Sequence, residues 1–404
     1  MQTAPSASGQ RLQQAAFWCA LGAGAAAAVS IAISQILLGA ALAALLIARI
    51  EWHAPKRWPW LAVFAVLSLL ALAFSDLPSA GLPQVRKFYV WLMLVAICST
   101  FSSSKHPRWL AAAWLAGGTA SALRGLWQFG VKYQHAAARG ENFYLSYVGD
   151  RITGFNSHWM TFSGQMMIVL LAGFALLLYG RPERRLRIAL LVCLPIVGLA
   201  LLLAWTRGVW IATGAALLYL LWGWRRWTVA LAPALALAAF AFGPASLRER
   251  VTSLVKPHGQ HDSNLHRIYT FRTGLEMIKA HPWLGLGLER VGPHVKEYIP
   301  ADLPQELPEG YYGHLHNIYI HYAAERGIPA TLAVIAFFLL TARDWLARLR
   351  RAPADSSAWL LRAGVAVVAG VLVTGFFEYN LGDSEVLGMT LAAVAAACAP
   401  RLDA

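Results

Sequence analysis

Charged side chains are scarce in this chain of 404 residues: Asp, Glu, Lys and Arg together make up 13% of it. Soluble domains carry about 25% charged residues. Hydrophobic residues account for 58%, and the mean hydropathy is +0.51. The composition excludes an ordinary soluble fold and indicates an integral membrane protein.

Cysteine is rare as well. The four cysteines, Cys19, Cys98, Cys193 and Cys398, each lie within an apolar run, and no two have paired spacing. A free cysteine in such a run behaves as a small buried hydrophobic residue. We therefore expect neither a disulfide nor a thiolate metal site.

Apolar runs are abundant by contrast. A membrane-spanning helix needs about 20 predominantly apolar residues, and about twelve stretches approach this length. We predict an all-α, polytopic membrane protein with a single transmembrane domain over residues 1–404. The expected spans are 16–32, 34–49, 59–74, 87–101, 109–130, 159–179, 186–204, 208–223, 227–243, 315–341, 359–377 and 384–399.

Lys and Arg are concentrated in alternate loops between these spans, around 49–57, 105–108, 181–187, 225–226 and 343–351. Cytoplasmic loops carry such an excess, so both termini are predicted to be cytoplasmic. Orientation accounts for most of the formal net charge of +14, and no nucleic-acid partner is expected. The longest hydrophilic segment, 244–314, becomes a periplasmic loop between the ninth and tenth spans.

Cations also occur on the outer face, where the same rule predicts few. Arg86, Arg151 and Arg207 each lie close to the start of a predicted span. Arg207, in "LAWTRGVW", has two interpretations. It is either an interfacial side chain that reaches water between Trp205 and Trp210, or a fixed cation for an anionic ligand, since guanidinium groups suit bidentate phosphate binding. The recurrence of such arginines near helix ends favours a polyanion site.

The periplasmic segment contains an amphipathic pattern. Asn264 can cap a helix and Pro282 stops one. Apolar residues recur between them at helical spacing: Ile268, Phe271, Leu275 and Ile278. We expect this helix to lie over the membrane bundle, with Arg267 and Arg272 off its apolar stripe, either in solvent or at the anion site. The "GLGLER" that follows lacks the strand and the glycines of a nucleotide-binding loop.

Histidines open the tenth predicted span, in "GHLHNIYIHYAAERGIPA" at 313–330. Titratable groups are costly at membrane depth and mark functional sites. On a helix that begins near His316, the residues Asn317, His321 and Glu325 share one face at four-residue spacing. We predict that this polar stripe points into the bundle.

Two kinds of chemistry suit these histidines. Zinc needs converging ligands, and His316 and His321 lie about 140° apart around a helix, so a metal could be bound only by His314 and His316 from a loop. The other chemistry is proton transfer, because imidazole, with an ordinary pKa of about 6.5, can act as a base near neutral pH. His316 is the best placed base and His314 is its rival. The non-catalytic alternative is a histidine that caps a helix or binds a carbonyl.

Three motifs together resemble the O-antigen ligase and O-antigen polymerase superfamily of bacterial envelope enzymes. They are "TRG" at 206–208, "GLEMIKAHPWLGLG" at 274–287 and "HNIYIHYAAERGIPA" at 316–330. His316 with Asn317 matches the family's His-Asn pair, and Glu325 with Gly327 matches its Glu-x-Gly pattern. Arg207 and Arg267 match its arginines. The chain departs from the family at Pro329 and Ala330, where many relatives have a glycine, and we expect this to affect packing only.

The resemblance implies a GT-C-like fold and the transfer of O-antigen polysaccharide from undecaprenyl pyrophosphate to the lipid A core, on the periplasmic face of the inner membrane. His316 would deprotonate the acceptor hydroxyl, and the anomeric carbon would be inverted. Arg207 and Arg267 would hold the pyrophosphate, so neither a metal nor another cofactor is expected, and no Asp-x-Asp motif is present.

The other residues are expected to bind substrate. This set comprises Arg86, Arg151, Arg272, His314, Asn317, His321 and Glu325. Glu325 would orient the histidine region or pair with Arg326. The segment "FEYNLGDSE" at 377–385 would shape the acceptor site.

Alternatives remain within and outside this superfamily. A polymerase would join lipid-linked repeats to one another, and a protein O-oligosaccharyltransferase would use a Ser or Thr acceptor. The ligase is favoured over the latter because protein-glycosylating relatives tend to be longer than 404 residues. A polyprenyl-lipid flippase is the candidate from another class. Transporters typically have internal repeats and broken helices at the bilayer midplane, whereas the polar residues here gather at one membrane face.

Overall fold

A computed structural model describes residues 7–230, 263–305, 312–351 and 358–399, together with Pro233, Ala241 and Arg248. In these ranges every regular element is a helix, which confirms the prediction of an all-α protein. The α-helices are α1 (Ala7–Ala26), α2 (Ile31–Ile47), α3 (Trp58–Ala73), α4 (Leu82–Arg86), α5 (Phe88–Trp91), α6 (Met93–Thr100), α7 (Lys105–Ala138), α8 (Phe143–Gly149), α9 (Trp159–Tyr179), α10 (Arg184–Leu203), α11 (Arg207–Trp224), α14 (Ser263–Ala280), α15 (Val291–His294), α16 (Ile318–Arg351), α17 (Ala358–Gly375) and α18 (Ser384–Cys398). Short 3-10 helices include η1 (Pro78–Gly81), η2 (Arg226–Ala230), η4 (Val295–Tyr298) and η6 (Asn380–Gly382).

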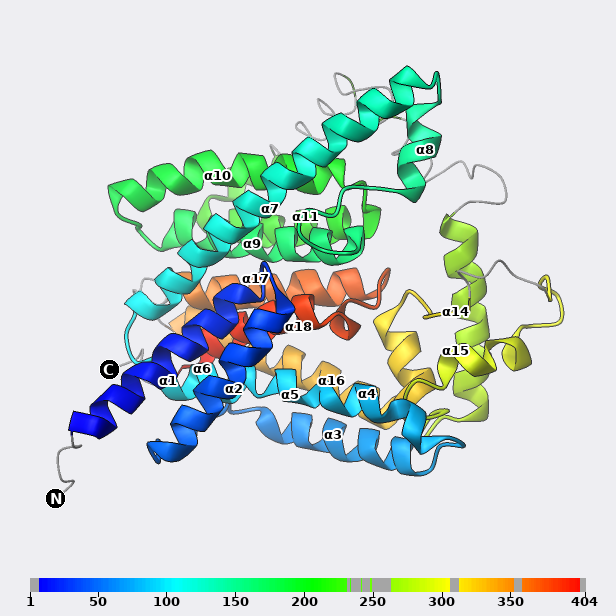
Figure 1. Ribbon diagram of the computed structural model, residues 1–404, viewed down its shortest axis with the longest axis horizontal. Helices are drawn as coiled ribbons and strands as arrows, with labels where there is room; N and C mark the ends of the chain where they lie inside the picture. The colour runs from blue at the N-terminus through cyan, green and yellow to red at the C-terminus, as the bar shows by residue number, and fades with distance from the viewer. Residues whose placement is uncertain are drawn as a thin grey trace.

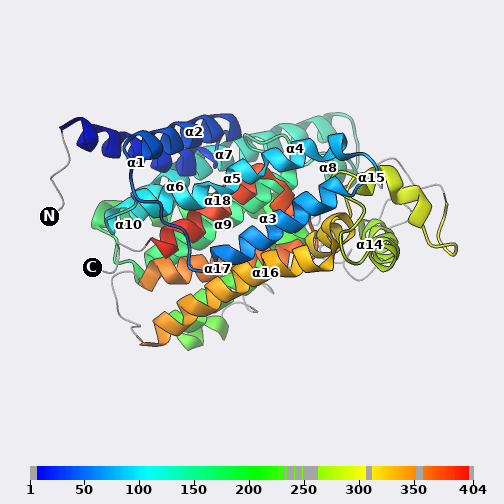
Figure 2. The same ribbon diagram turned by 90° about the horizontal axis from the view of Figure 1, so that it is seen from below.

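The long helices form a bundle whose members run in one general direction, with α14 lying across one end (Figures 1 and 2). α9 is central: 83% of its most apolar window is buried, against 28% for α10. An outer helix with so much exposed apolar surface suits a lipid environment. α1 begins at the end of the bundle opposite α14, as Figure 1 shows.

Four helices are long and apolar enough to cross a membrane: α9, α10, α16 and α17. The helices α2, α3 and α18 are apolar but shorter. Eleven of the twelve predicted spans coincide with helices or, for 87–101, with the consecutive short helices α5 and α6. Most of the span at 227–243 lies outside the described residues. The protein is therefore a helical membrane protein, and the number of twelve crossings stays a prediction.

α16 is broken close to its start. Gly327 has φ of 82° and ψ of 163°, outside the helical region. The break frees carbonyl groups on the preceding turn, and the segment after α14 supplies donors for them: Leu286 N–H bonds to Ala324 at 2.8 Å, and Gly287 N–H bonds to Glu325 at 3.0 Å. The Ile328 N–H in turn donates to the Pro282 carbonyl at 2.8 Å. The "GLGLER" segment is thus a docking segment for a broken helix, which agrees with the rejection of a nucleotide-binding loop.

α14 ends at Ala280 before Pro282, as its sequence pattern predicts, but only half of its predicted apolar stripe is covered: Leu275 and Ile278 are half-buried, and Ile278 packs on a buried cluster. Ile268 is 52% exposed and Phe271 is 41% exposed. The buried face carries Thr270, Thr273 and Met277 instead. Gly274 on the same face lies close to α16, since a Cβ there would lie 2.3 Å from the Ile320 Cγ2, and a periodicity argument that counts only apolar side chains misses these positions.

Candidate functional site

A polar cavity of about 320 Å³ lies beside α14, since the ring of its lining residue His316 is 4.7 Å from that of His266 on α14. It is bounded by the start of α9, the loop between α17 and α18, and the loop before α16. Its polar lining residues are Ser157, His158, Thr161, His314, His316, Thr374, Glu378, Tyr379, Asn380, Asp383 and Glu385. Two histidines predicted from sequence, His314 and His316, therefore face one cavity.

His316 lies just outside the helix in which the sequence placed it. α16 begins at Ile318, and the Asn317 side-chain oxygen accepts hydrogen bonds from Tyr319 and Ile320 N–H at 3.0 and 3.1 Å. Asn317 is therefore a helix cap, for which asparagine is well suited. His316 has φ of 47°, a left-handed conformation that a non-glycine residue adopts at a cost of about 1–3 kcal/mol. The predicted 140° relation between His316 and His321 fails because His316 is not helical.

Glu378 is the charged partner of His316. One Glu378 carboxylate oxygen lies 3.6 Å from His316 Nδ1, and the other accepts a hydrogen bond of 3.0 Å from Arg267 Nη2. Glu378 is 3% exposed. A buried carboxylate is stable only when cations or donors compensate it. Arg267 also donates through Nε to the Phe377 carbonyl at 3.4 Å, so this arginine holds the start of the loop as well as its carboxylate.

Other histidine rings surround His316. The ring centroid of His314 lies 4.2 Å away and that of His266 lies 4.7 Å away. Burial, together with the nearby histidines, lowers the pKa of His314 to about 3, and burial with His316 and Arg267 lowers the pKa of His266 to about 4. Burial also lowers the pKa of His158. These three rings are therefore neutral at physiological pH, and their low basicity makes them poor proton acceptors.

Arg207 is buried at the first position of α11, with 5% of its surface exposed. This burial argues against the interfacial side chain that reaches water. The next residue, Gly208, packs on Phe377, since a Cβ there would lie 2.6 Å from the Phe377 Cβ. Arg267 donates to the Phe377 carbonyl. Phe377 therefore contacts both Arg267 and Gly208, the residue next to Arg207. The N-terminus of α11 adds partial positive charge.

Arg151 holds the turn before Arg207 in place. Its guanidinium donates to the Val148 carbonyl at 3.0 Å and the Trp205 carbonyl at 3.4 Å, and it stacks over the Trp159 ring at 5.0 Å. Trp205 itself has φ of 50°. Arg151 therefore stabilises a strained turn, and its predicted contact with substrate stays a prediction.

Two predicted arginines lie apart from the cavity lining. Arg272 forms a bidentate pair with Asp302 at 2.8 and 2.9 Å, and both side chains are well exposed. Arg86 is exposed on α4. Neither borders the cavity, so their contact with substrate also stays a prediction.

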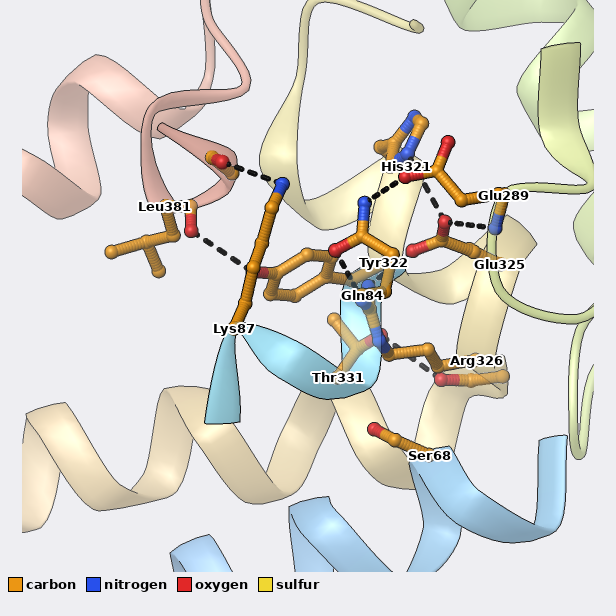
Figure 3. A network of polar contacts seen from close by, with 12 residues as sticks. Ser68, Gln84, Lys87, Glu289, His321, Tyr322, Glu325, Arg326, Thr331 and Leu381 are labelled. Carbon is orange, nitrogen blue, oxygen red and sulfur yellow. Dashed lines mark hydrogen bonds and ion pairs between the residues drawn. The ribbon is translucent and has the colours of Figure 1, made fainter. Parts of the chain in front are cut away.

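His321 and Glu325 belong to a separate buried network, shown in Figure 3. His321 Nε2 lies 3.8 Å from Glu325, which also pairs with Arg326 and accepts a 2.8 Å bond from the Glu289 N–H. Gln84 joins the network by donating to Glu289 and accepting from Arg326. The predicted pairing of Glu325 with Arg326 is present, and its role in orienting the histidine region stays a prediction. The network ties α16 to α4 and to the segment after α14, and neither His321 nor Glu325 lines the cavity.

Lys87 connects this network to the cavity loop. Its ammonium donates to the Gly382 carbonyl at 2.9 Å (Figure 3). Tyr322 donates to the Leu381 carbonyl at 3.4 Å in the same loop. The loop that carries Glu378 is thus held from the junction between α4 and α5 and from α16.

Asp383 is a second acidic group of the cavity. It accepts a 2.9 Å hydrogen bond from Thr161, and burial raises its pKa to about 6. Glu385 lines the same wall. Within the described residues, no group of three His, Cys, Asp or Glu side chains has an arrangement that could hold a metal ion.

Sequence reasoning missed Glu378 and Asp383 as individual residues. Both lie in "FEYNLGDSE", the segment assigned to the acceptor site. Two acidic residues within a short polar gap between apolar runs are the signal that could have identified them.

Comparison with known proteins gives one family match. Residues 194–335 match the family model described as O-Antigen ligase. This range contains Arg207, Arg267 and His316, and it ends before the loop that carries Glu378. No curated protein matches the chain.

Proposed function

We propose that this chain, a member of the O-antigen ligase and polymerase superfamily, transfers O-antigen polysaccharide from undecaprenyl pyrophosphate to a sugar hydroxyl of the lipid A core. The reaction takes place at the periplasmic leaflet of the inner membrane. One observation carries the proposal: His316 borders a polar cavity, and a buried carboxylate links it to Arg267.

His316 is the general base. Its Nδ1 faces Glu378 at 3.6 Å, so Nε2 is the nitrogen left for the acceptor. The acceptor hydroxyl gives its proton to Nε2, and its oxygen forms the new bond to the anomeric carbon. Glu378 stabilises the imidazolium that results, as a carboxylate does beside a catalytic histidine. Attack from the face opposite the leaving group inverts the anomeric centre.

Arg207 and Arg267 hold the donor pyrophosphate. As the bond from the anomeric carbon to the pyrophosphate oxygen breaks, the electron pair leaves on that oxygen. Preorganised cations stabilise such developing charge. The partial positive charge at the α11 N-terminus acts in the same direction.

The cavity binds the acceptor sugar. Its carboxylates and amide, Asp383, Glu385 and Asn380, offer hydrogen-bond acceptors to hydroxyl groups. An acidic wall also disfavours a pyrophosphate inside the cavity, because like charges repel. Donor and acceptor are therefore bound on different sides of His316.

The O-antigen polymerase is the second candidate within the superfamily, because it uses the same donor chemistry with a lipid-linked acceptor. Purified protein should be mixed with undecaprenyl-pyrophosphate-linked polysaccharide and lipid A core in the presence of EDTA. Ladder-bearing lipopolysaccharide supports a metal-independent ligase. Longer lipid-linked chains without it identify a polymerase, and the absence of both products rejects the proposal.

A further inference from the structure

In the described part of the chain, only one of the two Glu378 carboxylate oxygens accepts a hydrogen bond. This first oxygen accepts the 3.0 Å hydrogen bond from Arg267. The second is buried with no hydrogen-bond partner among the described residues, and His316 Nδ1 lies 3.6 Å from it. Burying a carboxylate oxygen without a hydrogen-bond donor costs free energy. A closer contact with His316 Nδ1 would reduce this cost.

Arg267 competes with His316 for the Glu378 carboxylate. Its side chain is 25% exposed, whereas that of Glu378 is 4% exposed, so an incoming anion can reach the arginine and not the carboxylate. A guanidinium accommodates a pyrophosphate oxygen with the same fork that it offers to a carboxylate. An anion that takes Arg267 draws it away from Glu378.

We infer that Glu378 is a positioning residue that couples donor binding to the base: when the donor pyrophosphate engages Arg267, Glu378 is released to His316. This inference rests on the proposed function. It makes the base most effective when a leaving group is already in place. It also predicts that Glu378 and the donor pyrophosphate compete for Arg267, because the donor must displace Glu378 from that arginine.

Donor affinity distinguishes this role of Glu378 from a purely structural one. In Glu378→Gln, Arg267 loses its anionic competitor, so undecaprenyl pyrophosphate should bind about 3- to 10-fold more tightly, as expected for release of a partly exposed ion pair. Turnover should fall about 10- to 100-fold, because His316 loses the group that stabilises its protonated form. A variant that only loosens the fold would bind the lipid more weakly and turn over more slowly.

The test is calorimetric titration of undecaprenyl pyrophosphate into full-length protein in nanodiscs, with transfer rates measured in parallel. Asp344→Asn is the matched control, because it removes the partner of another paired arginine, Arg57, and neither residue lines the cavity. It should change neither quantity. In an Arg267→Gln background, adding Glu378→Gln should give no gain in affinity.

Weaker or unchanged affinity in Glu378→Gln overturns the inference. If Glu378→Gln does not fold, Arg267→Gln and the double variant, which removes both charges, still form the comparison. A double variant that binds more tightly than Arg267→Gln shows simple repulsion by Glu378 and also overturns it. If wild-type protein does not bind undecaprenyl pyrophosphate at all, the proposed function fails together with the inference.

Discussion

The main-chain N–H of Leu286 donates a 2.8 Å hydrogen bond to the carbonyl of Ala324. This bond joins the segment after α14 to α16, whose helical geometry is interrupted at Gly327. The break at Gly327 leaves α16 in two parts, and the segment bonds to both, at Ala324 and Glu325 before the break and at Ile328 after it. The start of α16, which follows His316, is thus fixed by backbone hydrogen bonds to the segment that follows α14, the helix of Arg267.

Gly327→Ala should destabilise this interface. The positive φ costs alanine about 1–3 kcal/mol, and a Cβ at Gly327 would lie 2.0 Å from the Trp283 carbonyl oxygen. We expect a lower thermal unfolding midpoint and faster proteolysis within 281–290. Gly214→Ala is the control, because no atom lies within 4 Å of its added Cβ and alanine favours a helix. Equal unfolding midpoints for the two variants would show that the break in α16 tolerates a side chain at Gly327.

His316→Ala should reduce the transfer rate by about 10²- to 10⁴-fold, the contribution of a general base. His314→Ala should reduce it much less, because burial and neighbouring histidines lower the pKa of His314 to about 3, which leaves a weak base. Single-turnover transfer with saturating donor distinguishes the two variants. A His314→Ala enzyme that is as slow as His316→Ala would reverse the assignment.

The sequence predicts the helices well, because apolar runs of spanning length are a local signal. It also predicts that Asn317, His321 and Glu325 are buried, since their four-residue spacing fixes a common face. Helical periodicity alone does not distinguish Arg267 from Arg272, which lie on the same helix, and only the family resemblance singles out Arg267. Their environments depend on partners 111 and 30 residues away in the chain, Glu378 and Asp302, and helical periodicity contains no information about such contacts.

Arg207→Lys should weaken transfer although it keeps the positive charge. A lysine lacks the planar fork that binds two pyrophosphate oxygens, and its ammonium is more costly to bury in the position of Arg207, which is 5% exposed. We expect a fall of about 10²-fold or more in the transfer rate, comparable to the loss of one oxyanion donor.

Arg57→Lys is the matched control for Arg207→Lys, because its partly exposed pair with Asp344 does not line the cavity and surface pairs contribute about 0–1 kcal/mol. It should transfer at close to the wild-type rate. Wild-type kinetics in Arg207→Lys would mean that Arg207 supports the fold rather than the donor.

Asp383→Asn should stabilise the protein more at pH 7.5 than at pH 4.5. Burial raises the pKa of Asp383 from its ordinary 3.8 to about 6, so the folded protein retains a proton that the unfolded chain releases. Stability from this group therefore falls as pH rises from about 4 to about 6, and stays lower above that. The difference corresponds to at most about 3 kcal/mol. Asparagine has no proton to lose and can still accept the Thr161 hydrogen bond.

Thr161→Val is the companion to Asp383→Asn, because it removes the 2.9 Å hydrogen bond that favours the ionised carboxylate. This substitution should raise the pKa of Asp383 further, so its loss of stability should be larger at pH 7.5 than at pH 4.5. Thermal unfolding of wild-type protein and both variants in the same detergent at the two pH values measures both effects. Opposite pH trends for the two substitutions are expected, since one removes the charge and the other leaves it uncompensated. Parallel trends would mean that ionising Asp383 costs no free energy in the folded protein. Water in the cavity would then solvate this carboxylate more than its burial indicates.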